Sequence, residues 1–456
     1  MLTATALSEL AGAMPGGVVI TDADRIEKYR MDRAFDPTAG MPVAVVRAEN
    51  TAHVQATLRW AGVHGVTVTT RGAGTGLSGG STACEGGVVL STERMRAMHV
   101  DPTTRIAVVG PGLFNAEVKA AAAVHGLWYP PDPSSFEICS IGGNVATNAG
   151  GLCCVKYGVT SDYVLGLEVV LADATVIRLG GPRLKDTAGL SLTKLMVGSE
   201  GILGVVTEVT LRLIPAQAAP ATAVATFATD ADATAAVLRI TSALRPAMLE
   251  YMDAVAINAV EDMLRMGLDR GAAALLVAQS DAEGPARDRE MAAIVAAFEA
   301  HRATEIAVTD DLKEGEAFVF ARRSAIPAAE RRGKLLLEDV GVPLPRLPDL
   351  VDGVHRIGAV REVEIALIAH AGDGNTHPLL VFDPADEAAT ARAEAAFGEI
   401  MDLAISLGGT ITGEHGVGRL KRPWLSEQVG PDVMELTRRI KLAFDPRGIL
   451  NPGVIL

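Results

Sequence analysis

A run of five glycines within nine residues, Gly72 to Gly80, constrains this chain more than any other stretch. The run lies within Arg71-Gly72-Ala73-Gly74-Thr75-Gly76-Leu77-Ser78-Gly79-Gly80-Ser81. Because glycine has no Cβ, such a backbone can adopt positive φ and bring its N–H groups against a ligand. Successive N–H donors suit a phosphate. The run therefore predicts an anion-binding loop, with a plain glycine-rich surface loop as the alternative.

The spacing Gly74-x-Gly76-x-x-Gly79 also invites comparison with the Rossmann fingerprint, which requires a helix that opens at the glycines. Residues 81–87 cannot sustain a helix, and the short apolar run Val88 to Leu90 follows them. A strand-like run, Val66 to Thr70, precedes the glycines. The pattern is strand, glycine loop, strand, which does not fit a Rossmann unit.

Three later stretches are also irregular. Tyr129 to Ser135 carries three prolines and cannot form regular structure, so it is either a ligand-facing turn or a crossing loop. Ile141 to Gly151 and Val197 to Gly204 read as further glycine-rich loops, and the second runs into an alternating strand, Val205 to Leu213. One phosphate would need one loop. Several separated loops indicate one long ligand, and a dinucleotide of the length of FAD fits.

Length, charge and cysteine usage narrow the class of protein. A chain of 456 residues predicts two or three domains. A net charge of −14 without a Lys/Arg tract argues against nucleic-acid binding. The N-terminus shows no signal-peptide pattern, and no run of about 18 apolar residues is present. Four cysteines without metal or redox spacing favour a reducing compartment. We expect a cytoplasmic protein, with any membrane contact peripheral and through a partner.

Changes in the pattern of predicted loops, strands and helices divide the chain into four expected parts. Residues 1–37 are an N-terminal lead-in, and 38–217 form the loop-rich domain. After the linker Pro215 to Pro220, strands alternate with covering helices in 218–390, which predicts an α+β domain whose largely antiparallel sheet is covered on one face. Residues 391–456 return to helices, with one apolar face at Val433, Leu436 and Ile440.

Two C-terminal motifs carry the chemistry. His370 and His377 bracket a Gly/Asp/Asn turn between strands and can converge on one point. Glu414 and His415 lie in a glycine-flanked segment whose extended backbone would point them to opposite sides, one toward a metal and one toward a substrate. Two histidines and a carboxylate make the three-ligand set of a catalytic zinc or similar ion. On spacing alone, structural histidines remain the alternative.

Residues of about 40–215 resemble the FAD-binding domain of the vanillyl-alcohol oxidase / p-cresol methylhydroxylase superfamily. The motifs are RGAGTGLSGGS, PPDPSS, IGGNVATNAGG and GSEGILGVVTEV. Together with HAGDGNTHPLLVFD and GEHGVGRLK, nearly the whole chain resembles the D-2-hydroxyacid dehydrogenase branch, especially the glycolate oxidase FAD subunit and D-lactate dehydrogenase. The resemblance implies an α+β fold: a PCMH-type FAD-binding domain of two α/β subdomains, an α+β cap with an antiparallel sheet, and a C-terminal helical segment that packs back on the FAD domain.

The resemblance also implies site residues. The implied FAD contacts are Arg71, Gly72, Ala73, Gly74, Thr75, Gly76, Gly80, Ser81, Pro131, Asp132, Ser134, Gly142, Gly143, Asn144, Thr147, Asn148, Gly150, Gly151, Glu200, Gly201, Val206 and Asn451. Some members attach flavin through a histidine in the first glycine loop. This chain has Thr75 there and no histidine, so non-covalent FAD is expected.

At the reacting centre, the resemblance implies that His370, His377 and Glu414 bind a divalent metal, zinc or alternatively manganese. It makes His415 the base near flavin N5, and Arg322 the group that grips the substrate carboxylate. The implied reaction is FAD-dependent oxidation of a 2-hydroxy acid to the 2-oxo acid.

Two positions depart from the hydroxyglutarate enzymes, which carry a lysine and an asparagine where this chain has Leu337 and Leu379. The loss of these polar groups favours a small substrate, glycolate or D-lactate, over a longer diacid. Arg323 and Lys334 are substitute carboxylate partners.

Several alternatives remain. They are a D-2-hydroxyglutarate dehydrogenase, another flavin enzyme such as a sugar-lactone or aldehyde oxidoreductase, a non-catalytic FAD subunit of a larger complex, and a metal-dependent hydrolase. The chain has no iron–sulfur cysteine cluster, so electrons are expected to pass to a quinone, a cytochrome, an electron-transfer flavoprotein or an iron–sulfur subunit. The sequence is equally consistent with a homodimer and with a hetero-complex.

Overall fold

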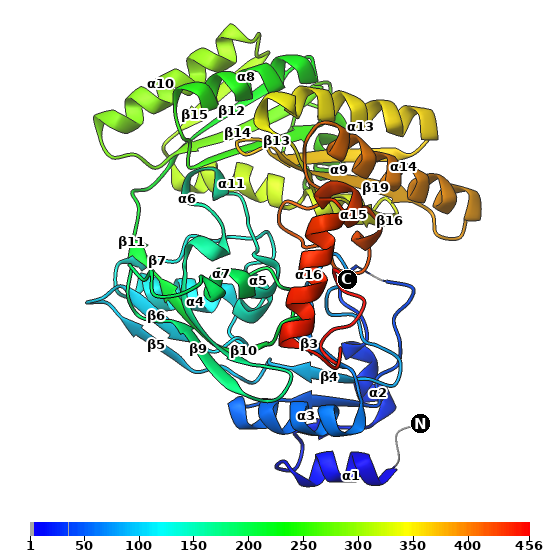
Figure 1. Ribbon diagram of the computed structural model, residues 1–456. Coiled ribbons are helices and arrows are strands. Elements are labelled where there is room, and N and C mark those ends of the chain that lie inside the picture. The colour runs from blue at the N-terminus through cyan, green and yellow to red at the C-terminus, as the bar shows by residue number, and fades with distance from the viewer. Residues whose placement is uncertain (1–3, 35) are drawn as a thin grey trace. The chain divides into compact units, whose positions relative to one another are not determined.

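The computed structural model describes residues 4–34 and 36–456 (Figure 1). Residues 1–3 and 35 of the expected lead-in lie outside the described residues. The chain divides into two compact units. Unit 1 comprises Met1–Gly150, Val159–Ala216 and Glu414–Leu456, and unit 2 comprises Gly151–Gly158 and Gln217–Gly413.

The first sheet of unit 1 is mostly parallel. In spatial order its strands are β1 (Val19–Ile20), β2 (Ala44–Arg47), β4 (Val88–Ser91) and β3 (Val68–Arg71). Strands β2, β4 and β3 are parallel, and β1 pairs antiparallel to β2. Helix α3 (Thr51–His64) begins where the Asn50 side chain accepts the His53 N–H, and it ends at Gly65 with φ of 64°.

The lead-in belongs to the core of this first sheet. Leu10 of α1 (Ala4–Gly12), together with Met14 and Val18, packs in the same apolar cluster as Val46 and Leu58. Two short helices, α2 (Ala23–Ile26) and η1 (Glu27–Tyr29), follow β1.

The second sheet of unit 1 is antiparallel. Its order is β5 (Met98–Asp101), β6 (Ile106–Val109), β10 (Val205–Arg212), β8 (Val164–Val170) and β9 (Val176–Gly180). The smaller elements are β7 (Leu127–Trp128), β11 (Ile214–Pro215), α4 (Asn115–Ala123), η2 (Thr160–Asp162) and α7 (Leu192–Met196). Ile440 and Phe444 of α16 (Pro431–Phe444) pack against the core of this sheet, so the C-terminal helix does return to the loop-rich part of the chain.

Helix α5 (Ile141–Thr147) corrects one expectation, since residues 141–151 were expected to form a loop. The Ser140 side chain caps the helix by accepting the Gly143 N–H at 3.3 Å. Asn148, with φ of 53°, ends it in the left-handed conformation. These two caps offset the low helix propensity of Gly142 and Gly143.

The expected apolar face of α16 is a second correction. Val433 and Leu436 are 49% and 52% exposed, and the buried residue of this helix is Met434. Helix α15 (Arg422–Val429) precedes α16.

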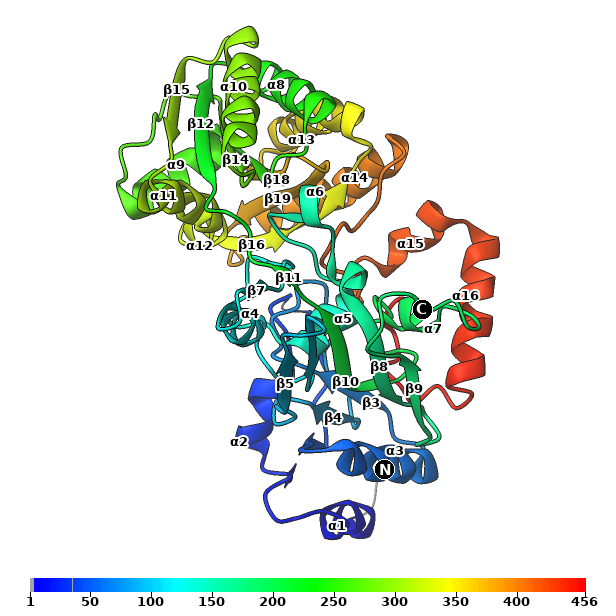
Figure 2. The ribbon, with the colours of Figure 1, turned by 90° about the vertical axis from the view of Figure 1, so that its left-hand side faces the viewer.

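Unit 2 is built on one eight-stranded sheet (Figure 2). Its order is β15 (Glu305–Thr309), β12 (Ala221–Phe227), β14 (Ala274–Ser280), β13 (Met248–Asp253), β18 (Glu364–His370), β19 (Asn375–Phe382) and β16 (Lys334–Leu337), and β17 (Val340–Gly341) also pairs with β19. Every pairing is antiparallel, as expected for the cap.

Helices cover both faces of this sheet, which corrects the expectation of one covered face. One layer holds α8 (Asp230–Ala243), α10 (Pro285–Ala300), α13 (Leu347–Arg361) and α14 (Glu387–Ser406). The other holds α9 (Ala254–Leu264), α11 (Leu312–Arg323) and α12 (Ala325–Glu330). Along β12, Phe227 stacks edge-on with Phe298 of α10, while Val224 packs in the same cluster as Val319 of α11. Their odd spacing places them on opposite faces.

The unit boundaries also differ from the expected 390/391 division. Helix α14 packs on α13 and β19, and its buried Ala396 and Ile400 belong to unit 2, so the division falls at Gly413/Glu414. The segment Gly151–Gly158, which contains α6 (Cys154–Tyr157), also belongs to unit 2 because Lys156 and Tyr157 both bond to Asp281. The 3-10 turn η3 (Leu344–Arg346) precedes α13.

None of the helices in the described residues combines the length and apolar character that a membrane crossing requires.

Candidate functional site

The glycine loop of unit 1 connects β3 to β4, which confirms the strand, loop, strand prediction. A Cβ on Gly72 would lie 2.3 Å from Ser140 Oγ. A Cβ on Gly74, whose φ is 76°, would lie 2.0 Å from the Arg71 guanidinium. Ser140 Oγ also accepts the Ala73 N–H at 3.1 Å. The loop therefore lies directly against the N-terminus of α5, where a Cβ on Gly72 would displace Ser140, and the positive φ of Gly74 favours glycine.

Several expected FAD contacts shape the loops through their own hydrogen bonds. Asn144 is buried, and its Oδ1 accepts Asn115 Nδ2 at 3.1 Å. Asn148 Oδ1 accepts the Ser161 N–H at 2.8 Å. Asn451 Nδ2 donates to the carbonyls of Gly80 and Glu200 at 2.8 and 2.7 Å. These amides thus hold separate segments of unit 1 in register.

The other expected FAD contacts lie in unit 1, except Gly151, which lies in unit 2. Arg71 ends β3, donates to the Met31 carbonyl at 2.9 Å, and has its pKa lowered by burial. Gly142 and Gly143 form the first turn of α5, Thr147 ends that helix, and Val206 lies in β10. The remaining residues lie outside regular structure: Thr75, Gly76, Gly80, Ser81, Pro131, Asp132, Ser134, Gly150, Gly151 and Gly201, of which Gly151 falls in unit 2.

Glu200 faces another part of the chain. Its Oε1 accepts the Val417 N–H at 2.7 Å and its Oε2 accepts the Gly418 N–H at 2.8 Å. Burial raises the pKa of this carboxyl to about 7. The residue adopts φ of 48°, a strained conformation for a non-glycine residue. Its side chain is therefore built to hold the segment that follows Glu414 and His415.

Glu414 and His415 correct a further expectation. Their side chains do not point to opposite sides, because His415 Nε2 lies 3.8 Å from Glu414 Oε1. The backbone bends here, and Gly416 has φ of 86°. Ser78 Oγ of the glycine loop donates to the His415 carbonyl at 3.0 Å. His415 is thereby attached to the loop expected to bind FAD.

In unit 2, His370 and His377 converge as predicted. Strand β18 ends at His370, β19 begins at Asn375, and the register places His377 opposite Ile368. The two imidazole rings stand edge to face with centroids 5.1 Å apart. Both side chains are only 4% exposed.

A buried carboxylate that the sequence analysis did not single out, Glu250 on β13, joins this pair to Arg322. His370 Nδ1 lies 2.8 and 3.0 Å from the two Glu250 oxygens. Arg322 Nη2, from the last turn of α11, lies 2.8 Å from Glu250 Oε2. The side chains of Arg322 and Glu250 are each 1% exposed. Contact with an ionised carboxylate places the His370 ring proton on Nδ1.

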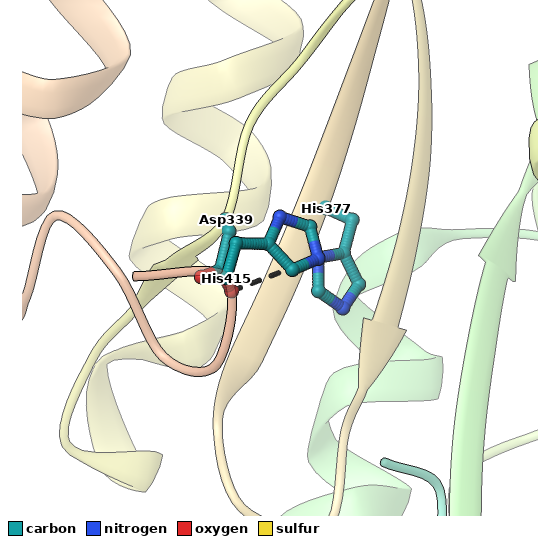
Figure 3. A group of neighbouring side chains, drawn as sticks. All are labelled: Asp339, His377 and His415. Carbon is teal, nitrogen blue, oxygen red and sulfur yellow. Dashed lines mark ion pairs between the residues drawn. The ribbon is translucent and has the colours of Figure 1, made fainter. Parts of the chain in front are cut away.

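Asp339 is a second carboxylate that the sequence analysis missed. Figure 3 shows it beside His377, with Nδ1 and Oδ1 3.7 Å apart. Asp339 Oδ2 accepts Thr412 Oγ1–H at 2.7 Å and the Gly413 N–H at 2.9 Å. The available signal was Glu338-Asp339, two consecutive acids after the apolar strand β16. Both are fully buried.

The two leucines that depart from the hydroxyglutarate enzymes turn out to be neighbours. Leu337 on β16 pairs directly with Leu379 on β19. Leu379 is two residues beyond His377, so the leucine pair lies on the same sheet face as the histidines. This face is apolar next to the His370–His377 pair.

Comparison with known proteins identifies the family of this chain. The family described as FAD linked oxidases, C-terminal domain, matches residues 216–455, and the FAD binding domain matches residues 42–180. The chain belongs to the FAD-linked oxidase family. It is therefore an oxidoreductase with an FAD-binding domain, which confirms the resemblance found in the sequence.

Two relatives of this FAD-linked oxidase match over nearly their whole length. It is 40% identical to the glycolate oxidase subunit GlcD of Bacillus subtilis, over 93% of this chain and 92% of the relative. It is 35% identical to a D-lactate dehydrogenase of Archaeoglobus fulgidus, over 94% and 96%.

Solved structures share the fold at low identity. A substrate-bound p-cresol methylhydroxylase gives a TM-score of 0.82 at 18% identity, over 98% of this chain and 96% of that chain. A 4-ethylphenol oxidase from Gulosibacter chungangensis gives 0.81 at 19% identity, over 99% and 96%. The expected PCMH-type fold is confirmed.

Proposed function

We propose that this FAD-linked oxidase oxidises a small D-2-hydroxy acid, glycolate or D-lactate, to the corresponding 2-oxo acid. The observation that carries the proposal is the buried group of His370, His377, Glu250 and Arg322 in a chain of this family. Imidazoles beside an arginine suit a hydroxyl next to a carboxylate. The names of the relatives, glycolate oxidase subunit and D-lactate dehydrogenase, support the same substrate class.

The proposed metal ligands are His370, His377 and Glu414, for zinc or alternatively manganese. The residues present fit a divalent cation, since the two imidazoles converge and His370 Nδ1 faces Glu250. Metal-bound histidines commonly donate their other ring N–H to a carboxylate in this way. A cation held there would lower the pKa of the substrate hydroxyl.

Arg322 is the proposed partner of the substrate carboxylate. Its guanidinium has five N–H donors in a rigid fork, and the Glu250 contact at Nη2 fixes the orientation of that fork. Arg323, at the end of α11, and Lys334, at the start of β16, remain substitute partners. The paired Leu337 and Leu379 offer no polar group to a second carboxylate, which favours glycolate and D-lactate over D-2-hydroxyglutarate.

His415 is the proposed base. It would remove the proton from the substrate hydroxyl, and FAD, when bound, would supply the acceptor for the hydride from Cα. General base catalysis contributes about 10²–10⁴-fold. We expect His415→Ala to retain FAD and to slow flavin reduction by about that factor. Near wild-type reduction in stopped-flow traces would contradict the role of His415.

FAD is proposed to bind non-covalently through the glycine loop, the Pro131–Ser134 turn and the segments around α5 and Gly201. No histidine stands in the glycine loop to attach flavin. The denatured protein should therefore show its unmodified mass, with FAD in the supernatant. A mass increased by one flavin would refute this.

Electrons are proposed to leave to a separate acceptor: a quinone, a cytochrome, an electron-transfer flavoprotein or an iron–sulfur subunit. The relative in Bacillus subtilis is named a subunit, which supports a hetero-complex, with a homodimer as the alternative. We propose a cytoplasmic location, with any membrane contact made through such a partner.

The test is a visible absorption spectrum, repeated after anaerobic addition of glycolate, D-lactate and D-2-hydroxyglutarate in turn. We expect flavin bands that glycolate or D-lactate bleaches. Bleaching by hydroxyglutarate alone would move the substrate to the longer diacid. Flavin bands that no acid bleaches would overturn the proposed reaction.

A further inference from the structure

The segment that carries Glu414 and His415 has a buried carboxylate anchor immediately before it. Asp339, which is fully buried in unit 2, accepts Thr412 Oγ1–H at 2.7 Å and the Gly413 N–H at 2.9 Å. Gly413 is held closely at this point, because a Cβ there would lie 2.3 Å from Asn375 Oδ1. The chain is therefore fixed at the residue that precedes Glu414.

A second buried carboxylate anchors the chain immediately after the pair. In unit 1, Glu200 accepts the N–H groups of Val417 and Gly418, one on each oxygen. A Cβ on Gly416 would lie 2.9 Å from Glu200 Oε1, so the carboxylate lies against the backbone itself. Glu200 is 5% exposed.

Ser78 of the glycine loop contacts the same segment through uncharged groups. Ser78 Oγ donates to the His415 carbonyl, and the Ser78 carbonyl accepts the N–H groups of Arg419 and Leu420 at 2.9 and 3.2 Å. Gly418 passes so close that a Cβ would lie 1.9 Å from the Ser78 carbonyl oxygen. Hydrogen bonds and close contacts thus hold the backbone at Gly413, at His415 and from Gly416 to Leu420.

We propose that Asp339 and Glu200 are positioning residues that fix the backbone on either side of Glu414 and His415, one anchor in each unit. Hydrogen bonds from backbone N–H groups to an ionised carboxylate are about twice as strong as neutral ones. Displacing a catalytic group by about 1 Å can cost about 10²-fold in rate. The proposal rests on the proposed function, because His415 is the base only there. It also gives Glu200 a role distinct from the FAD contact that the sequence suggested.

The experiment compares Glu200→Gln and Asp339→Asn with the wild-type holoenzyme by amide hydrogen exchange. An amide side chain has one acceptor oxygen and would turn an NH₂ group toward the second donor. We expect exchange within residues 412–420 to accelerate about tenfold or more while other peptides keep their rates, since an N–H without its partner opens more easily. The matched controls are the half-buried Glu208→Gln and the exposed Asp352→Asn, which should leave this segment unchanged.

Kinetics supply the second measurement. With the best acid substrate, Glu200→Gln should retain its flavin and lower the rate of flavin reduction about 10- to 100-fold, with KM within about threefold. Ser78→Ala, a milder change that removes only the Oγ contact, should shift both measurements in the same direction if Glu200→Gln does not fold.

Two outcomes would overturn the proposal. The first is unchanged exchange at 412–420 in both anchor variants, even if Glu200→Gln loses its flavin, because Glu200 would then serve the cofactor alone. The second is accelerated exchange with a reduction rate within twofold of wild type, which would make the anchors structural only. A wild-type protein that no hydroxy acid reduces would overturn the proposed function instead, and the exchange data would still decide whether the anchors exist.

Discussion

The glycine loop of unit 1 and the buried ionic group of unit 2 are specified in opposite ways. Gly72 and Gly74 work through the absence of a side chain, since a Cβ on Gly72 would collide with Ser140 and Gly74 adopts a positive φ. Glu250, Arg322 and His370 work through charge and hydrogen bonding in a nearly dry environment. The first region should tolerate changes of charge nearby but no added atom. The second should tolerate small changes of shape but no change of charge.

Neutralising Glu250 should have the largest effect on stability. Glu250→Gln leaves the Arg322 guanidinium buried without its counter-charge, and breaking a buried pair in this way costs about 3–5 kcal/mol. Urea unfolding of the holoenzyme measures this loss in the free energy of unfolding. Glu364→Gln is the matched control, because Glu364 pairs with Arg332 on the surface end of β18, and an exposed pair is worth about 0–1 kcal/mol. Equal losses of unfolding free energy in the two variants would show that the charge of Glu250 contributes no more than that of a surface residue.

His377→Ala tests whether the ionic group of unit 2 also holds the metal. We expect metal content, measured by elemental analysis after dialysis, to fall to background, because one of three proposed ligands is gone. The flavin spectrum should stay, since the glycine loop is in unit 1. His301→Ala, a change at the C-cap of α10, serves as the control. Undiminished metal content would remove His377 from the ligand set.

Gly72→Ala probes the other region. The added Cβ would meet Ser140 Oγ at 2.3 Å and push against the cap of α5, at a cost of about 1–3 kcal/mol. We expect reduced flavin occupancy in the purified protein with metal content unchanged. Gly16→Ala adds the same atom with no neighbour within 4 Å and should behave as wild type. Full flavin occupancy in Gly72→Ala would show that the loop can shift to accommodate the added Cβ.

The smallest expected effect concerns His355 and its two aspartate partners, a charged cluster outside the proposed site. His355 Nε2 lies 3.2 Å from Asp253 and Nδ1 lies 3.4 Å from Asp230, and these hydrogen bonds raise the pKa of His355 to about 10. A raised pKa means stability that is complete below the unfolded value near 6.5 and is lost as pH rises toward 10.

His355→Gln should therefore lower the free energy of unfolding at pH 6 by about 1–2 kcal/mol, a figure reduced for the partial exposure of the ring. The difference from wild type should shrink steadily between pH 7 and pH 10. Denaturant titrations at pH 6, 8 and 10 measure it. A difference that is constant with pH would show that the contribution of His355 is packing rather than charge.

The same contrast explains what the sequence alone could predict. The strand, loop, strand unit around Gly72 and the hairpin between His370 and His377 follow from local composition and spacing, and both were predicted. Helix α5 was missed because its caps, Ser140 and Asn148, were hidden among glycines. Glu250, Asp339 and the anchoring role of Glu200 depend on partners 120, 74 and 217 positions away along the chain, which no local pattern encodes.

The bend at Glu414 and His415 was missed for a related reason. A glycine-flanked dipeptide can be extended or folded, and the anchors on either side decide which. The second helical layer of unit 2 was missed because strands such as β12 and β13 are buried along their whole length, and such strands lack the alternation that marks a sheet with one covered face.

The first sheet of unit 1 has a consequence for the newly made chain. Val68 of β3 donates its N–H to the Ile449 carbonyl at 2.7 Å, and its own carbonyl accepts the Asn451 N–H at 2.9 Å. The edge beside the glycine loop is thus closed by a segment that is synthesised long after β3. At about 5–20 residues per second, Val68 would wait on the order of 20 to 80 s for these partners. FAD loading should accordingly wait until residues 449–451 have been made, and a truncation just before Ile449 should emerge without bound flavin.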